Sequence, residues 1–178
     1  MYYSTEYNSI IRPLLLVCDD NNLIGLWMMG QKYFCPLNEQ PVSKDNHPVL
    51  VQAKKWLDRY FNGEMPDIKE LPLAPVGSSF RQEVWKILCS IPYGEVMTYG
   101  QIADRIAKNY GKEKMSAQAV GGAVGHNPIS VIIPCHRVVG TNGSLTGYAG
   151  GVAKKLTLLK HEGLDVDKFT IPTKGTAI

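Results

Sequence analysis

The stretch between residues 64 and 77 constrains the fold of this chain more than any other feature, because it holds three prolines. Proline removes a backbone donor and biases the preceding residue away from helical geometry, so neither a helix nor a central strand can run through this stretch. We therefore interpret it as a linker between two domains. The expected division is an N-terminal domain over residues 1–75 with its linker from about residue 64, a C-terminal domain over residues 76–165 and a tail over residues 166–178.

Short apolar runs and one helical pattern predict an α/β fold for the N-terminal domain. Residues 14–18 and 23–27 are apolar, and the Asp and Asn residues between them are typical of a turn. Pro48 suits the first turn of a helix, and apolar residues then recur at helical spacing as far as Phe61. We expect this helix to end at Gly63.

Capping patterns predict that the C-terminal domain is mainly helical. Ser79 with Gln82, and Thr98 with Gln101, match the Ser/Thr-x-x-Gln capping box that begins a helix. Ser116 can cap a third helix after a polar turn. Two helices joined by a short turn form the helix-turn-helix layout, which is typical of DNA-binding domains.

Two glycine-rich segments can bring a ligand close to the backbone. The third helix, expected over residues 117–126, contains Gly121 and Gly122, although a glycine inside a helix costs about 1 kcal/mol relative to alanine. A DNA backbone or a tightly packed neighbouring helix would each explain such a slim helix, and the sequence leaves both open. The loop over residues 140–151 could fold over a flat ligand or form a plain surface loop.

The segment around Cys135 carries the chemistry. Pro134 precedes this cysteine, His136 and Arg137 follow it, and a nearby positive charge can lower a cysteine pKa below its usual value of about 8.5. The preceding run over residues 130–133 is apolar and β-branched, which predicts a buried strand that holds the sulfur at a fixed point. The alternative is a buried packing thiol, as free cysteines often are.

The sequence also offers a base and a partner for that base. His136 adjoins Cys135, but successive side chains on an extended segment point apart, so we expect a bridging water between them. A helical pattern from residue 152 stops at Gly163, which places Glu162 in the last turn, where the helix dipole disfavours an acid. Glu162 is therefore a candidate partner for His136, with a solvated helix end as the alternative.

Composition and charge narrow the class of protein. No apolar run reaches about eighteen residues and no secretory leader is present, so we expect a cytoplasmic protein without a membrane span. The four cysteines are scattered, which argues against a disulfide framework and a structural metal. Residues 76–165 carry ten Lys and Arg against six Asp and Glu, and no acid occurs between Glu113 and Glu162. This region suits a polyanion such as DNA, with chance as the alternative.

Several of these motifs together resemble one family. They are Pro134 to Val138, Asn127-Pro128, Tyr99, the run from Ala119 to Ala123, and His161-Glu162-Gly163. In this combination the chain resembles the O6-alkylguanine-DNA alkyltransferases, closely from about residue 79 to residue 163. Over residues 1–75 the resemblance is looser and implies an RNase H-like α/β domain, followed by a mainly α domain with a helix-turn-helix.

The resemblance implies single-turnover repair of DNA. The alkyl group of O6-alkylguanine would pass irreversibly to Cys135, with O4-alkylthymine left open as a second substrate. Double-stranded DNA would be bound from the minor-groove side, and the damaged base would be flipped into a pocket. No cofactor is implied, and we expect a monomer.

The resemblance also implies a role for each site residue. His136 would take the thiol proton through water, with Glu162 holding the imidazole. Tyr99 would donate a proton to the base, and Asn127 would brace the turn before the reactive segment. The implied DNA-binding residues are Arg81, Ala117, Gln118, Gly122 and Thr141, and the implied substrate-pocket residues are Val124, Val138, Tyr148 and Ala149.

The chain departs from the family pattern at named positions. Gln118 stands where many members place an arginine that fills the space of the flipped base. Ala149 stands where some relatives have serine. Some members bind zinc in the N-terminal domain; Cys18 is a candidate for one such ligand, but Ile24 stands where a histidine is needed, so we predict no metal.

Three other functions are compatible with parts of the sequence. A non-enzymatic module that recognises alkylated bases would lack the cysteine, so Cys135 argues against it. A helix-turn-helix transcription regulator would bind DNA without forming a covalent product. A cysteine hydrolase would need a peptide cleft and an oxyanion hole, which the sequence does not locate.

Overall fold

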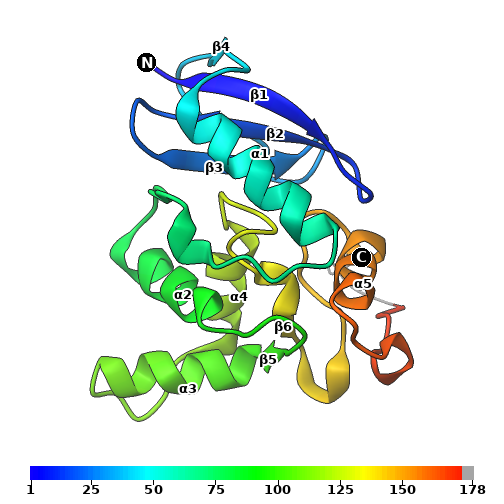
Figure 1. The fold of residues 1–178 in the computed structure, drawn as a ribbon. Coiled ribbons are helices and arrows are strands. Elements are labelled where there is room, and N and C mark those ends of the chain that lie inside the picture. Colours follow the sequence, from blue (N-terminus) through cyan, green and yellow to red (C-terminus); the bar gives the residue numbers. More distant parts are fainter. Residues whose placement is uncertain (174–178) are drawn as a thin grey trace. The chain divides into compact units, whose positions relative to one another are not determined.

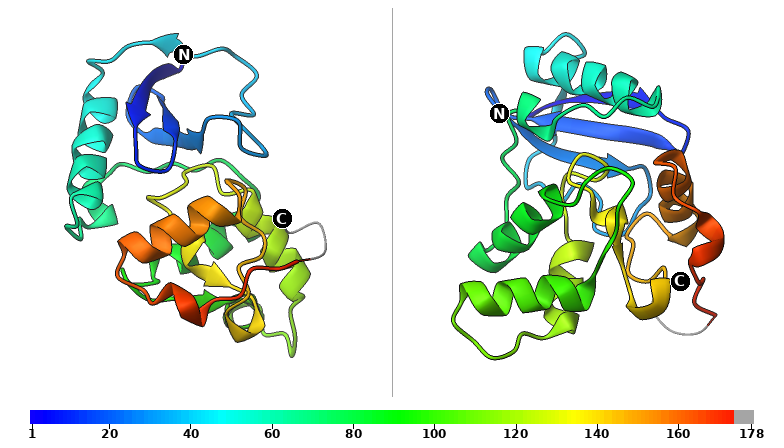
Figure 2. Two further views of the ribbon diagram at one scale, coloured as in Figure 1. Left: turned by 90° about the vertical axis from the view of Figure 1, so that its right-hand side faces the viewer. Right: turned by 60° about the horizontal axis from the view of Figure 1, so that its bottom comes forward.

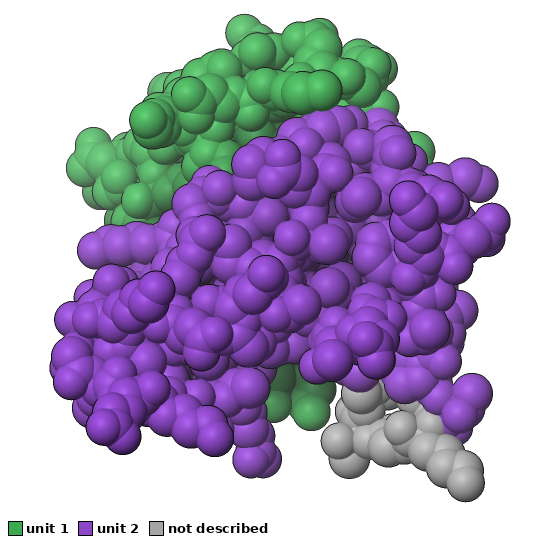
Figure 3. Space-filling model, turned by 90° about the horizontal axis from the view of Figure 1, so that it is seen from below, with its two compact units in different colours: residues 1–76, 128–132 green, residues 77–127, 133–178 purple. Residues whose placement is uncertain are grey.

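The protein is described by a computed structural model over residues 1–173, and these residues separate into two compact units (Figure 3). Unit 1 contains residues 1–76 and 128–132, and unit 2 contains residues 77–127 and the chain from Ile133 onward. Unit 1 is a sheet with a helix, and unit 2 is mainly helical, which confirms the expected fold class. The assignment of residues 128–132 to unit 1 has no counterpart in the sequence patterns.

The sheet of unit 1 has the strand order β3-β2-β1-β4. Strand β2 is antiparallel to β1 and to β3, whereas β4 is parallel to β1. The sequence predicted β2 and β3 but missed β1, because β1 reads Tyr-Ser-Thr-Glu-Tyr-Asn and contains no apolar run. The bounds are β1 Tyr3–Asn8, β2 Pro13–Cys18, β3 Leu23–Met28 and β4 Val42–Ser43.

The predicted N-terminal helix is confirmed as α1, Pro48–Phe61, with proline in its first turn. It lies across one face of the sheet and contacts β1, β2 and β3 (Figures 1 and 2). Its buried stripe fits the helical spacing seen in the sequence. The stripe consists of Val49, Leu50, Ala53, Trp56, Leu57 and Tyr60.

Residues 128–132 extend unit 1 at strand β3. The Leu26 amide donates to the Pro128 carbonyl at 2.8 Å, and the Ser130 amide donates to the Leu26 carbonyl at 2.9 Å. Two such bonds on one residue are the pattern of a parallel bridge, which pairs Leu26 with Ile129. The segment that precedes Cys135 is thereby fixed to a strand of the N-terminal sheet.

Four helices build the described part of unit 2, and side-chain caps begin three of them. The fourth follows Gly151 and has no side-chain cap. The Thr98–Gln101 capping box and the Ser116 cap are confirmed. The first cap is wrong by one residue, because Ser78 rather than Ser79 accepts a hydrogen bond from the Arg81 amide. The helices are α2 Ser79–Cys89, α3 Tyr99–Asn109, α4 Ala117–Gly125 and α5 Val152–His161.

Helices α3 and α4 pack together as the predicted helix-turn-helix, and α2 is tied to α4. The Trp85 indole donates to the Ala123 carbonyl at 2.9 Å. A Cβ added at Gly122 would meet nothing within 4 Å, and one at Gly121 would only reach ordinary contact with the Tyr99 ring. Tight helix packing therefore does not explain this glycine pair, and the slim face of α4 is open.

The rest of unit 2 joins short elements around the segment that contains Cys135. Strands β5, Met97–Thr98, and β6, Val138–Val139, pair in parallel. Part of the expected tail is paired as well: Leu145 donates its amide to the Thr170 carbonyl, and Thr170 donates to Gly143. Residues 174–178 of that tail lie outside the described residues. Over residues 1–173, no helix has both the length and the apolar character needed to cross a membrane.

Candidate active site

The segment before Cys135 is buried but is not the expected strand. Val131 has a φ of 69°, a left-handed conformation that β-branched residues rarely adopt. The Ile132 amide donates to the Ser130 carbonyl, and the Cys135 amide donates to the Ile133 carbonyl, each at 2.8 Å. These are tight turns, because each bond joins residues two apart. Cys135 then begins a 3₁₀ turn that ends at Arg137.

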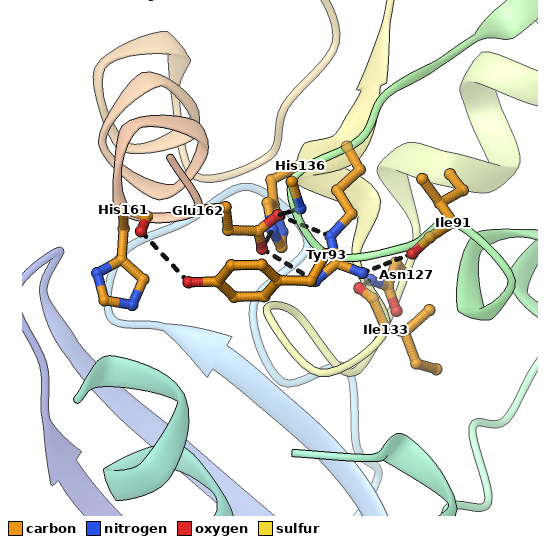
Figure 4. Close-up of polar contacts among 9 residues, drawn as sticks. Ile91, Tyr93, Asn127, Ile133, His136, His161 and Glu162 are labelled. Atoms are coloured by element: carbon orange, nitrogen blue, oxygen red, sulfur yellow. Dashed lines mark hydrogen bonds and ion pairs between the residues drawn. The ribbon is translucent and has the colours of Figure 1, made fainter. Parts of the chain in front are cut away.

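Asn127, at the end of α4, holds the two ends of this turn together. Its side-chain nitrogen donates to the Ile133 carbonyl at 2.8 Å (Figure 4). Its side chain also hydrogen-bonds the Cys135 thiol. One amide side chain therefore fixes both the backbone two residues before the cysteine and the sulfur itself.

His136 and Glu162 form a buried pair, as Figure 4 shows. His136 Nε2 lies 2.6 Å from Glu162 Oε1, and both side chains are fully buried. Glu162 is the C-cap residue of α5, so the structure brings together two residues from a turn and a helix end. A carboxylate on Nε2 fixes the tautomer with the proton on Nε2, which leaves Nδ1 as an acceptor.

Arg137 is the second partner of Glu162, and the sequence reasoning missed this role. Its Nε donates to Glu162 Oε2 at 2.9 Å, and its Nη2 donates to Oε1 at 3.0 Å. The guanidinium also donates to the Ile91 carbonyl at 2.6 Å and lies over the Tyr93 ring. Such a two-point pair is specific for a carboxylate. The signal was an arginine next to His136 in a stretch that has no acid between Glu113 and Glu162.

Burial and these contacts set the charge of each group. Burial alone would raise the pKa of Glu162, but its bonds with His136 and Arg137 hold that pKa well below its usual range. Burial lowers the pKa of His136. Burial also raises the pKa of the Cys135 thiol, against the opposing effects of Asn127 and Lys155. The resting site is therefore a thiol, a neutral imidazole and a carboxylate.

The expectation that His136 and Arg137 lower the pKa of Cys135 is thus wrong for the resting protein. His136 is uncharged, and the charge of Arg137 is balanced by Glu162. His136 can instead serve as a general base, because its Nδ1 is buried and has no hydrogen-bond partner among residues 1–173. A neutral imidazole with a free lone pair can accept the thiol proton, directly or through one water.

Two tyrosines lie close to the cysteine. The Tyr99 hydroxyl donates to the Thr146 carbonyl at 2.8 Å. The Tyr148 hydroxyl oxygen is buried and makes no hydrogen bond within the described part of the chain. Burial raises the pKa of both tyrosines, and a thiolate at Cys135 would raise it further. Both hydroxyls therefore carry their protons at neutral pH and can act as donors.

The remaining predicted residues fall into two groups. The first group lies on the exterior of unit 2: Ala117, Gln118 and Gly122 on the open face of α4, Thr141 in a 3₁₀ turn, and the half-buried Arg81 in the first turn of α2. The second group is buried or half-buried: Val124, Val138 and Ala149. Val124 and Val138 therefore lie in the interior with the site residues, whereas Ala149, like Arg81, is only partly buried.

A metal centre is not evident in the described chain. Over residues 1–173, no group of three or more His, Cys, Asp or Glu side chains could share an ion. Cys18 Sγ does lie 3.3 Å from His47 Nδ1, a pairing that the sequence reasoning did not anticipate. Two protein groups fall short of the four that a structural zinc site uses.

Known proteins match most of the chain. Residues 1–75 match the family model described as "6-O-methylguanine DNA methyltransferase, ribonuclease-like domain", and residues 79–164 match "6-O-methylguanine DNA methyltransferase, DNA binding domain". A methylated-DNA–protein-cysteine methyltransferase of Haemophilus influenzae is 40% identical over 173 residues, covering 97% of this chain and 93% of the relative.

Two further relatives are similar over most of their length. The methylated-DNA–protein-cysteine methyltransferase of Shigella flexneri is 51% identical over 158 residues, covering 85% of this chain and 90% of the relative. A crystal structure of Mycobacterium tuberculosis OGT in complex with DNA matches with a TM-score of 0.79 at 39% identity, covering 94% of each chain. The chain therefore belongs to the 6-O-methylguanine DNA methyltransferase family.

Proposed function

We propose that this protein repairs O6-alkylguanine in DNA by transferring the alkyl group irreversibly to its own Cys135. The observation that carries the proposal is the buried relay from Glu162 through His136 toward the cysteine. The relay occurs in a family whose relatives are named methylated-DNA–protein-cysteine methyltransferases. Each molecule acts once, because a thioether offers no route back to the thiol under physiological conditions.

In the proposed reaction, His136 Nδ1 takes the Cys135 proton through one water as the sulfur attacks the sp³ carbon on O6. The new bond is S–C, the broken bond is C–O6, and the electron pair of that bond stays with guanine. A proton from Tyr99 neutralises the leaving base. Glu162 stabilises the imidazolium that forms, because it is already a buried carboxylate at hydrogen-bond distance.

The proposed substrate is a flipped base in double-stranded DNA approached from the minor groove. The open, slim face of α4 with Ala117, Gln118 and Gly122 supports close approach of the DNA backbone. Arg81 and Thr141 lie on the exterior as further DNA contacts. The base would sit near Val124, Val138, Tyr148 and Ala149, with the backbone of Ala149 in place of a serine hydroxyl.

The domain assignment that accompanies this function is an alkyltransferase domain over residues 76–165, an N-terminal α/β domain over residues 1–75 and a tail from residue 166. All the side chains of the relay come from unit 2, which supports placing the chemistry there. We also propose that the protein acts in the cytoplasm, since all four cysteines are free and a thiol reagent needs a reducing compartment.

The test is the intact mass of the protein after incubation with a duplex that contains O6-methylguanine. We expect a gain of one methylene equivalent, mapped by peptide analysis to Cys135 and absent from the exposed Cys89. An unmodified duplex is the control. No gain would favour the transcription-regulator reading, a product that hydrolyses away would favour the hydrolase, and methylation of another cysteine would refute the assignment.

Gln118 tests the proposed DNA interface, because it is exposed on α4 where many relatives have arginine. Gln118→Arg adds a cation, so it should tighten duplex binding by about 1 kcal/mol and increase the salt dependence by about one phosphate contact. Gln118→Ala should slow transfer from duplex DNA but spare free O6-benzylguanine, which requires no flipping. Fluorescence anisotropy over a salt series and single-turnover rates measure the two effects.

The control for the positive charge added by Gln118→Arg is Gln40→Arg, at an exposed position of unit 1. It should leave duplex affinity closer to wild type than Gln118→Arg does. Equal slowing of both substrates by Gln118→Ala would place Gln118 in support of the pocket instead of the DNA.

A further inference from the structure

The segment over residues 164–170, which follows α5, pairs with the glycine-rich loop after β6. Thr170 donates its amide to the Gly143 carbonyl at 3.0 Å, and its own carbonyl accepts the Leu145 amide at 2.9 Å. The two bonds lie on either side of Ser144, which is the pattern of a parallel bridge between Ser144 and Thr170. The segment therefore supplies backbone hydrogen bonds to a loop of the candidate active site.

Phe169 anchors this pairing through its side chain. The ring is half-buried and packs against an apolar cluster that contains Leu145, a fully buried residue of the loop. The backbones also approach closely at Gly143, which has a φ of 73°. A Cβ added there would lie 2.8 Å from the Lys168 carbonyl and 3.4 Å from the Phe169 ring. An apolar contact and two hydrogen bonds therefore hold the loop at this end.

The next residues of the loop touch the candidate active site. The Thr146 carbonyl accepts the Tyr99 hydroxyl at 2.8 Å. At Gly147, whose φ is 75°, a Cβ would come within 2.7 Å of that hydroxyl. The hydroxyl oxygen of Tyr148, one residue further, is buried. Residues 144–146 are thus fixed on two sides, and their position sets where Tyr148 lies.

The two glycines give this part of the loop freedom that the packing of Phe169 removes. Gly143 and Gly147 both have a positive φ, and glycine passes between backbone conformations more readily than other residues. An apolar pocket whose wall stays in place discriminates by about 10- to 200-fold for one methylene group of its substrate. A wall that can swing outward loses this discrimination, so the contacts at the Gly143 end bear on substrate size.

We propose that Phe169 is a positioning residue that, together with the Thr170 bridge, holds the loop over the alkylated base and limits the size of the alkyl group that the site accepts. The proposal deepens the function proposed above and rests on it. Phe169 acts through Leu145 and the residues that follow it, not on the reacting atoms. Release of Phe169 lets Tyr148 move outward, which makes room for a bulky alkyl group and weakens the hold on a methylated base.

The test compares single-turnover rates on three duplexes that differ only in the lesion, which is O6-methylguanine, O6-benzylguanine or O6-(4-phenylbenzyl)guanine. The last two share benzylic chemistry and differ in size, so the ratio of their rates reports the room around the alkyl group. In Phe169→Ala we expect this ratio to rise about tenfold in favour of the larger lesion, while the O6-methylguanine rate falls. Intact mass measures transfer from each duplex.

Two further variants separate positioning from a general loss of structure. Phe169→Leu keeps an apolar side chain and should return the size ratio to the wild-type value. Ile171→Ala removes a nearby side chain that is 57% exposed and should leave the ratio unchanged. Equal slowing of Phe169→Ala on all three duplexes would overturn the proposal, because partial unfolding reduces transfer without favouring the larger lesion.

Thr170→Pro tests the same link in case Phe169→Ala does not fold. Proline removes the amide that donates to Gly143. Phe169 already has the extended conformation of a residue before proline, with a φ of −102° and a ψ of 148°. The size ratio should rise in this variant as well, and a ratio equal to that of wild type would count against the proposal.

The wild-type protein distinguishes failure of this proposal from failure of the proposed function. Methyl transfer by wild type, combined with an unchanged size ratio in the variants, would overturn the role of Phe169 alone. Absence of transfer from every duplex would refute the proposed function and this role with it.

Discussion

Cys135→Ala is expected to abolish alkyl transfer while leaving the affinity for duplex DNA nearly unchanged. The sulfur is the only atom that receives the alkyl group in the proposed reaction, so no residual rate should remain. In the proposed interface, DNA affinity depends mainly on phosphate contacts and exposed residues of α4, whereas Cys135 is buried. Intact mass measures transfer, and fluorescence anisotropy with an O6-methylguanine duplex measures binding.

The matched variant is Cys89→Ala, which removes an exposed thiol from the same unit. It should transfer the alkyl group at the wild-type rate. Transfer by Cys135→Ala, or its loss in Cys89→Ala, would move the nucleophile elsewhere. A large loss of DNA affinity in Cys135→Ala would mean that the cysteine supports the fold of the interface.

Glu162→Gln is expected to lower the transfer rate by about 10²–10⁴-fold, the usual contribution of general acid–base catalysis. The substitution keeps the shape of the side chain but removes the charge that, in the proposed reaction, stabilises the His136 imidazolium. It also leaves Arg137 buried without its carboxylate, which typically costs about 3–5 kcal/mol of unfolding free energy. Single-turnover rates and thermal melting measure the two effects, with the exposed Glu95→Gln as control.

The pH dependence of stability separates these groups. The pKa of Glu162 is held below its ordinary 4.5, so its stabilisation is complete above about pH 4.5 and is lost as the pH falls through the lower folded value. The pKa of His136 is below its ordinary 6.5, so the unfolded chain binds a proton first and stability also falls below about pH 6.5. Melting temperatures from pH 8 to pH 3 should show both losses in wild type.

In Glu162→Gln the loss below about pH 4.5 should be reduced, because the titrating carboxyl is gone. An acid profile identical to that of wild type, together with an unchanged transfer rate, would make Glu162 a structural helix end. A lower transfer rate with an unchanged melting curve would show that Arg137 finds another partner.

Local rules predicted much of this fold, and long-range contacts explain the failures. Thr98 and Ser116 mark helix starts because their side chains bond amides three residues away, an interaction visible in the sequence. The run over residues 130–133 looks like a strand because its residues are β-branched. It turns instead, because its backbone bonds to Leu26 and within itself, and no local pattern reports such bonds.

In the site, too, local patterns could be predicted from the sequence and long-range contacts could not. Cys135, His136 and Glu162 could be selected because their residue types and the family motif are specific. The second partner of Glu162 could not be selected, because the pairing of Arg137 with Glu162 depends on where α5 ends. The burial of Lys155 could not be predicted for a similar reason. Lys155 follows Lys154 in a helix, and only packing distinguishes the buried lysine from its neighbour.

The pairing of residues 128–132 with Leu26 limits which fragments of this protein can fold on their own. The chain passes from one unit to the other at the linker and twice more around this segment, so a cut in the linker does not separate two self-sufficient modules. A fragment that begins at Gly77 would keep every side chain of the relay yet lose the strand to which Pro128 and Ser130 bond. The reactive half is therefore unsuited to transplantation into a fusion protein unless strand β3 travels with it.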